Sequence, residues 1–236
     1  MGRNEYMKKT LANKKLWLGM LVLALVFAVA VASCDNGLTN YDTTLVCFGD
    51  SLTAGYGATV PFRENKSQSY PAFLQRKVNA HSIRVVNAGV SGDTTAQGLD
   101  RVYRDVLSKD PQIVIILLGA NDFLKPILNL TFTNTIPVNE TQDNLKKIID
   151  KINNENIKIY LAKFYTDAMV KKYPIFSSIA TEYDAMFDAL ATSSNNITLI
   201  EDIWTGVWGV HMSDPIHPNA EGYRIMANNI YNALKL

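Results

Sequence analysis

Two residue types that build metal centres and covalent cross-links are scarce in this sequence. The 236 residues include two cysteines, Cys34 and Cys47, and three histidines, His81, His211 and His217. No spacing among these residues matches a zinc-ligand pattern, so we expect no metal and no other cofactor. Cys47 lies in an apolar stretch and is expected to act as a small core residue. If Cys34 carries a lipid, as argued below, no intrachain disulfide can form.

The chain also lacks a large excess of charge of either sign. Its formal net charge is +1 at pH 7. Without residues 1–33 it loses five basic residues and Glu5, which leaves 18 basic against 21 acidic residues and a net charge of about −3. Binding to a phosphate backbone would need a concentrated stripe of lysine and arginine, and this remainder has none. Nucleic acid is therefore not an expected partner.

The one long hydrophobic run lies near the N-terminus. Five basic residues from Arg3 to Lys15 precede the 17-residue apolar run Leu16–Ala32. Basic, apolar and small residues in this order are typical of a secretory signal. The ending, Val31–Cys34, resembles the lipobox of bacterial lipoproteins, in which the cysteine carries lipid. The alternative is an uncleaved transmembrane anchor, because about 17 apolar residues can just span a bilayer.

These features divide the chain into three parts. Residues 1–33 are predicted to be a lipoprotein signal peptide, and Cys34 the lipid attachment residue. Residues 34–43 are polar and are predicted to be a tether, followed by one folded domain over residues 44–236. Under either interpretation of the N-terminus, we expect a bacterial protein held at a membrane by its N-terminus, outside the cytoplasm.

From residue 44 onward, apolar stretches alternate with amphipathic stretches of helical length. Residues 113–118, "IVIILL", are apolar throughout, as expected of a central strand covered on both faces. The alternation predicts an α/β fold with a parallel sheet of about five strands and helices on both faces. Thr94 and its neighbours offer an N-cap for one helix, and Thr141 is expected to cap another. The expected strands are Thr44–Phe48, Ile83–Ala88, Ile113–Leu118, Lys158–Ala162 and Thr198–Ile200, and the expected helices are Gln68–Asn79, Thr94–Ser108, Thr141–Asn154, Tyr173–Ser193 and Asn219–Leu234.

Polar and small residues follow several of these strands. In open parallel sheets, sites form at the carboxyl ends of the strands, so segments remote in sequence meet at one edge. Ser51 follows the first strand, Gly92 the second and Asn121 the third, while Asp214 and His217 precede the last helix. The edge would therefore hold a serine, backbone N–H groups, a side-chain amide and an Asp/His pair.

Four sequence blocks at these positions carry a resemblance to a known family. They read "GDSLTAGYG", "NAGVSGDTTAQGLDR", "LLGANDFL" and "DPIHPNAEGY". In this order they resemble the SGNH, or GDSL, hydrolase family, in the branch of bacterial thioesterases, lysophospholipases and arylesterases, from about Leu45 to the end of the chain. The resemblance implies a flavodoxin-like three-layer α/β/α fold. It also implies that Ser51 is the nucleophile, that Asp214 and His217 complete a triad, and that Gly92 and Asn121 occupy oxyanion positions.

The residue types suit this chemistry. A serine hydroxyl needs a hydrogen-bonded base as it attacks, and imidazole is suited because it titrates near physiological pH. Asp214 would fix the tautomer of His217 and stabilise the imidazolium. The backbone N–H groups of Ser51 and Gly92 and the side-chain amide of Asn121 would donate to the oxyanion.

Each of these residues has a structural alternative. If it is not catalytic, Ser51 is expected to be a helix N-cap. In the same way, His217 would be the entry to the last helix and Asn121 would be part of a turn. His211 is a second candidate base, although its setting suggests loop packing, and His81 is expected to be exposed. Asp50 and Asp93 are expected to hold loops rather than to perform chemistry.

The expected activity is hydrolysis of a carboxylic ester or thioester through an acyl-enzyme on Ser51. Lysophospholipids, aryl esters and O-acetylated sugars are the candidate substrates, that is, small-molecule or lipid esters. The alternatives are a carbohydrate O-acetylesterase and a lipoprotein that binds a ligand in the same pocket without turnover. No aromatic platform can be placed from the sequence, so sugar and lipid are not distinguished.

A long apolar segment after the third block, residues 123–140, suggests a cover for the acyl site. The alternative is that its side chains pack on the sheet. The apolar residues in question are Phe123, Leu124, Ile127, Leu128, Leu130 and Phe132.

Overall fold

The computed structural model describes residues 41–128, 138–153, 156–172 and 177–236. The predicted signal peptide, Cys34 and the tether up to residue 40 lie outside these ranges. Within them, no helix combines the length and the apolar character needed to cross a membrane.

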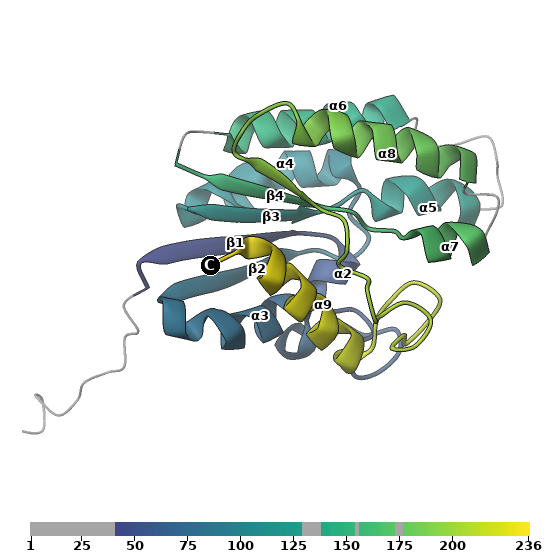
Figure 1. Ribbon diagram of the computed structural model, residues 1–236, viewed down its shortest axis with the longest axis horizontal. Helices are drawn as coiled ribbons and strands as arrows, with labels where there is room; N and C mark the ends of the chain where they lie inside the picture. Colours follow the sequence, from purple (N-terminus) through teal and green to yellow (C-terminus); the bar gives the residue numbers. More distant parts are fainter. Residues whose placement is uncertain (1–40, 129–137, 154–155, 173–176) are drawn as a thin grey trace, which may run out of the picture. The chain divides into compact units, whose positions relative to one another are not determined.

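A single sheet of five parallel strands organises residues 41–236, in the order β2-β1-β3-β4-β5 (Figure 1). Each strand agrees within one residue at either end with a strand expected from the sequence, and the prediction of a parallel sheet is confirmed. The strands are β1 (Thr43–Gly49), β2 (Ile83–Gly89), β3 (Ile113–Leu117), β4 (Lys158–Ala162) and β5 (Ile197–Ile200).

The centre of the sheet explains the apolar run in the sequence. β3 pairs with β1 on one side and with β4 on the other, and all of its residues are buried. A strand covered on both faces has no solvent side, so its residues do not alternate between apolar and polar. Cys47 in β1 is fully buried as well, and this burial raises the pKa of its thiol, in keeping with a core residue.

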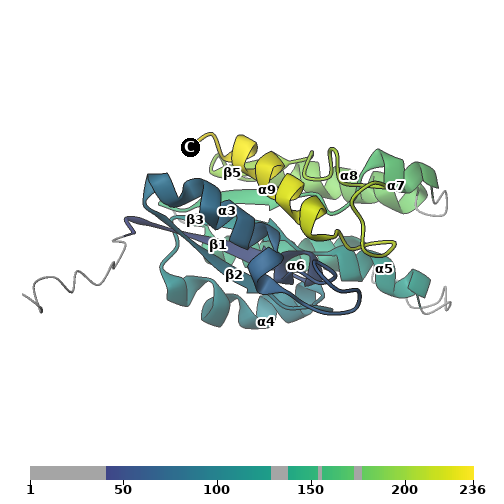
Figure 2. The same ribbon diagram turned by 90° about the horizontal axis from the view of Figure 1, so that it is seen from below.

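Helices cover both faces of the sheet (Figure 2). α3 and α9 pack side by side on one face, and α4 packs against α6 on the other. α8 contacts α6 and β5. The three-layer arrangement expected from the sequence is thus confirmed. These helices are α3 (Tyr70–Val78), α4 (Thr95–Asp105), α6 (Val138–Ile152), α8 (Ser177–Ala191) and α9 (Ala220–Leu234).

Three further helices at the carboxyl end of the sheet were not expected from the sequence. They are α2 (Ser51–Ala54), α5 (Ala120–Leu128) and α7 (Asp167–Lys172). α5 follows Gly119 and contains Pro126, two residue types that usually argue against a helix. The expected helix Tyr173–Ser193 is α8 in the structure, and it begins later, at Ser177.

The predicted cap at Thr141 is wrong. α6 begins three residues earlier, at Val138, so Thr141 lies inside the helix and is fully buried. Its hydroxyl lies 3.2 Å from the Tyr183 hydroxyl and 3.5 Å from an oxygen of Asp122. A buried hydroxyl needs polar partners, and here they come from neighbouring elements rather than from a helix end.

The strand order places a crevice beside β1. The chain leaves β1 for β2 on one side and then crosses to β3 on the other, so the direction of winding reverses at β1. Ligands bind at such reversals, outside the carboxyl ends of the strands. α2 and α5 lie at this end of the sheet (Figure 1).

Candidate active site

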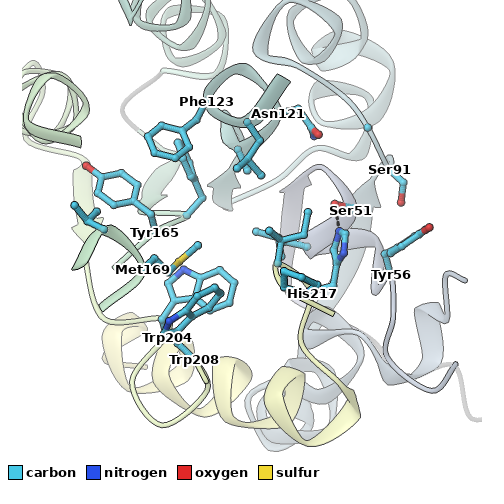
Figure 3. Close-up of a pocket in the computed structure, with 18 residues that line it drawn as sticks. Ser51, Tyr56, Ser91, Asn121, Phe123, Tyr165, Met169, Trp204, Trp208 and His217 are labelled. Atoms are coloured by element: carbon cyan, nitrogen blue, oxygen red, sulfur yellow. Dashed lines mark hydrogen bonds between the residues drawn. The ribbon is translucent and has the colours of Figure 1, made fainter. Parts of the chain in front are cut away.

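Ser51 is the first residue of α2, directly after the turn that ends β1. The N-cap of α2 is Asp50, whose Oδ1 accepts a hydrogen bond from the Leu52 N–H at 3.0 Å. The alternative interpretation of Ser51 as the cap is therefore wrong. Its Oγ lies 2.9 Å from Nε2 of His217 instead, the bond drawn in Figure 3.

A tight turn before α9 holds Asp214 and His217 together. Oδ1 of Asp214 accepts the backbone N–H groups of Ile216, at 2.9 Å, and His217, at 2.8 Å. Its Oδ2 lies 2.8 Å from Nδ1 of His217. Burial alone would raise the pKa of Asp214, but the hydrogen bonds from Ile216 and His217 outweigh it and hold this pKa below its usual range. The carboxylate is thus ionised and fixed in place.

These contacts define the tautomer of the imidazole. A carboxylate only accepts hydrogen bonds, so Nδ1 of His217 carries the proton and donates it to Asp214. Nε2 is then an acceptor for the Ser51 hydroxyl. His217 lies two residues before Asn219, the N-cap of α9, so it does not begin that helix. The structure therefore brings together the serine, histidine and aspartate named from the sequence.

Donors suited to an oxyanion lie next to Ser51. The Ser51 N–H is in the first turn of α2, where a helix has no acceptors of its own for its N–H groups. Gly92 has a φ of 85°, and a Cβ at this position would meet no atom within 4 Å, so the backbone angle and not crowding favours glycine. Asn121, in the first turn of α5, donates from Nδ2 to the Asp93 carbonyl at 2.9 Å. These three donors come from the ends of three different strands.

Two buried aspartates fix the loops around these donors, as expected for Asp93. Its carboxylate pairs with Arg101, which also donates to the carbonyls of Gly49 and Ala88, both at 2.8 Å. Asp122 accepts from the Thr95 N–H at 2.9 Å. The loops after β1, β2 and β3 are thereby tied together.

Asp50 differs from Asp93 because, among the described residues, no ion pair joins Asp50 to a cation. It is fully buried, and its Oδ2 is 3.5 Å from Nδ2 of Asn121. Burial raises the pKa of Asp50 to about 7, against the hydrogen bond from Leu52 and with the help of the nearby Asp122 and Asp93 carboxylates. The residue before Ser51 therefore changes its charge near neutral pH.

A pocket of about 570 Å³ opens beside Ser51 and His217. In Figure 3 the side chains on one side of this pair are aromatic or aliphatic, while Tyr56 and Ser91 lie on the other. We use the name apolar wall for eight aromatic and aliphatic residues that line the pocket: Phe123, Leu124, Phe164, Tyr165, Met169, Val170, Trp204 and Trp208. Within the described residues, no group of three or more His, Cys, Asp or Glu side chains is placed to hold a metal.

Comparison with known proteins identifies the family. A family model, the GDSL-like lipase/acylhydrolase family, matches residues 47–225. The chain belongs to this family.

Two curated relatives illustrate the similarity of this GDSL hydrolase. One is the esterase TesA of Pseudomonas aeruginosa, 28% identical over 198 residues that cover 81% of this chain and 88% of the relative. The other is the thioesterase 1/protease 1/lysophospholipase L1 of Escherichia coli, 28% identical over 194 residues that cover 78% and 80% of the two chains.

A solved structure shows the same similarity. A crystal structure of TesA aligns with a TM-score of 0.66 at 28% identity, over 81% of this chain and 98% of that one. The predicted family, fold and reaction class are confirmed: the chain is a GDSL-type serine esterase that hydrolyses ester bonds.

Sequence reasoning missed most of the apolar wall of this GDSL hydrolase. Of the six residues predicted to line or cover the acyl site, Phe123 and Leu124 line the pocket. The side chains of the other four, Ile127, Leu128, Leu130 and Phe132, lie outside what the structure describes. The aromatic surface that the sequence did not reveal comes largely from Trp204 and Trp208, four residues apart, and from Tyr165. Only the Trp-x-x-x-Trp spacing offered a signal.

The other two histidines lie elsewhere. His81 follows α3 and is exposed, as expected, with its Nε2 3.3 Å from the Tyr231 hydroxyl of α9. His211 does not line the pocket, and its carbonyl accepts the Asn219 N–H at 3.0 Å. His217 is thus the histidine that the structure places at Ser51.

Proposed function

We propose that this GDSL hydrolase cleaves esters through an acyl-enzyme on Ser51. The Ser51 oxygen attacks the acyl carbonyl while its proton passes to Nε2 of His217, and the imidazolium then gives that proton to the departing alcohol or thiol. Water releases the acyl group by the same steps. The observation that supports these roles is the line of hydrogen bonds, 2.9 and 2.8 Å long, from Ser51 through His217 to Asp214.

In this mechanism the negative oxygen of the tetrahedral intermediate binds to the three donors beside Ser51. They are the N–H groups of Ser51 and Gly92 and the side-chain amide of Asn121. Nδ2 of Asn121 donates to the Asp93 carbonyl at 2.9 Å and to Oδ2 of Asp50 at 3.5 Å, and in the mechanism the oxyanion replaces the longer of these two bonds. Donors fixed in advance stabilise the transition state without reorganising when the charge forms.

The test is hydrolysis of p-nitrophenyl butyrate by Ser51→Ala. We expect turnover to fall about 10⁴-fold or more, because Ser51 carries the acyl intermediate in this mechanism. Ser91→Ala is the matched control: Ser91 also lines the pocket, and its Oγ has no hydrogen-bond partner among the described residues. Turnover that survives Ser51→Ala would contradict the proposal, as would equal losses in the two variants.

The apolar wall supports an acyl group larger than acetyl. A pocket of about 570 Å³ is well within the range of about 300–1,000 Å³ that holds whole small-molecule ligands, and acetyl would occupy a small part of it. Alkyl chains of medium length and aryl groups fit this chemistry. A carbohydrate O-acetylesterase is therefore the second candidate.

A series of p-nitrophenyl esters from acetate to dodecanoate distinguishes an esterase for longer acyl groups from an O-acetylesterase. Each methylene that enters the wall contributes about 0.8 kcal/mol, so kcat/KM should rise about fourfold per carbon until the pocket is full. Highest activity on acetate, with a steady decline along the series, would favour the O-acetylesterase instead.

The N-terminal sequence supports a lipid anchor at Cys34 and a location on the extracytoplasmic side of a bacterial membrane, either periplasmic or at the cell surface. This part of the proposal rests on the lipobox-like Val31–Cys34 and the apolar run before it. Labelling of the full chain with radioactive palmitate in a bacterial host tests it. Cys34→Ala should abolish the label, whereas Cys47→Ala should keep it.

A further inference from the structure

Tyr56 contacts His217 in a way that the proposed mechanism does not yet use. The ring centroids are 4.6 Å apart, at an interplanar angle of 49°. Figure 3 shows the phenol beside the imidazole, on the side away from Phe123 and the two tryptophans. Ser51 and Asp214 are the partners of the two ring nitrogens, so the tilted contact with Tyr56 is separate from the hydrogen bonds of His217.

The backbone holds this ring in place from two directions. The Tyr56 N–H donates to the Ser51 carbonyl at 3.1 Å, and the Tyr56 carbonyl accepts the Tyr223 hydroxyl at 2.8 Å. Gly57 follows with a φ of 76°, and a Cβ there would lie 3.3 Å from Cβ of His217. The chain therefore passes close to His217 directly after Tyr56, and any movement of Tyr56 is coupled to the turn that carries Ser51.

The contact changes in strength during the reaction. The face of an aromatic ring carries partial negative charge and attracts a cation within about 6 Å of its centroid. His217 is neutral before attack and positively charged once it holds the Ser51 proton. An interaction stronger in the charged state lowers the barrier, because only differential stabilisation accelerates a step.

We propose that Tyr56 is a positioning residue whose ring keeps the His217 imidazole in line with Ser51 and stabilises its protonated form. This inference rests on the proposed role of His217 as the base. The ring, and not the hydroxyl, carries the effect. Phenylalanine at position 56 should therefore preserve the function of Tyr56, whereas an aliphatic side chain of similar size should not.

Tyr56→Phe and Tyr56→Leu, assayed with p-nitrophenyl butyrate across both limbs of the pH profile, test the proposal. We expect Tyr56→Phe to retain kcat. Tyr56→Leu should lower kcat about fivefold with little change in KM, and should move the midpoint of the acid limb of kcat/KM to lower pH, because the cation has lost its π partner.

Thermal unfolding of both variants separates this effect from lost stability. If Tyr56→Leu unfolds at a lower temperature than the wild type but keeps the wild-type pH profile, the ring contributes only packing and the proposal fails. It also fails if Tyr56→Phe loses as much kcat as Tyr56→Leu. Ser51→Ala in the same assay reports on the mechanism independently: activity retained in that variant would remove the role of His217, whatever Tyr56 does.

Discussion

The two sides of the pocket are held together by different forces. On the polar side, Ser51, Asn121 and the Asp214–His217 turn are each fixed by hydrogen bonds of defined geometry. On the apolar wall, contacts such as the stacked rings of Phe123 and Tyr165, 5.7 Å apart, are fixed by packing. The first side needs particular atoms at particular places, and the second needs only shape and volume. Substitutions should therefore cause abrupt losses on the polar side and graded changes on the wall.

The largest loss is expected from Asp214→Asn. An amide at this position can donate to the imidazole and so favour the wrong tautomer, which should lower kcat about 10⁴-fold with little effect on KM. Steady-state kinetics with p-nitrophenyl butyrate measures it, and the exposed Asp202→Asn is the control. A loss below about tenfold would mean that hydrogen-bond geometry matters less on the polar side than we argue.

The next largest effect concerns stability, at Asp50. Its pKa is raised by burial from 3.8 to about 7. Because the pKa of Asp50 is higher in the folded state, its stabilising contribution is complete below pH 3.8 and is lost as the pH rises to about 7. At about 1.4 kcal/mol per pKa unit, the loss is about 4 kcal/mol.

Asp50→Asn tests this because it keeps an acceptor for the Leu52 N–H but cannot ionise. We compare the free energies of unfolding of Asp50→Asn and the wild type. Between pH 4 and pH 8, their difference should change by about 4 kcal/mol in favour of the variant. Urea unfolding at several pH values measures it, with the exposed Asp143→Asn as the control. A difference that stays constant with pH would show that Asp50 is not the buried acid inferred here.

Asn121→Ala should have a slightly smaller effect. Loss of one oxyanion donor costs about 10²–10³ in kcat, or about 3 kcal/mol. KM should change little, because the donor is used mainly in the transition state. An effect confined to KM would instead make Asn121 a residue that binds the ground state.

The contrast between the two sides also explains what the sequence could predict. Ser51, Gly92, Asn121, Asp214 and His217 were predicted from four sequence blocks that resemble the GDSL family, and such blocks are recognisable because the chemistry permits few residue types at these positions. The strands were predicted closely for a related reason: continuous apolar runs leave few alternatives to a buried strand. Both kinds of prediction depend on a small set of permitted residue types.

The apolar wall could not be predicted in the same way. Trp204, Trp208 and Met169 could each be replaced by other large apolar residues, so no fixed pattern marks them. α5 was not predicted because Gly119 and Pro126 both disfavour a helix. In the structure this local preference is overridden, since Phe123 packs into the core. Tyr56 is part of the block "GDSLTAGYG", but its role could not be predicted from the sequence. Its contact with His217 joins segments about 160 residues apart in the chain.

The smallest expected effect lies on the apolar wall, at Met169. This side chain lines the pocket and is partly exposed, so Met169→Trp can add volume without straining the core. The larger ring should shorten the acyl site and lower kcat/KM for long acyl esters about tenfold, by about 1–2 kcal/mol, while acetate hydrolysis stays unchanged. Met169→Leu, which conserves volume, should leave the chain-length profile as it is. An equal loss on every ester would show that the wall supports the polar side as well, and that the two sides are not independent.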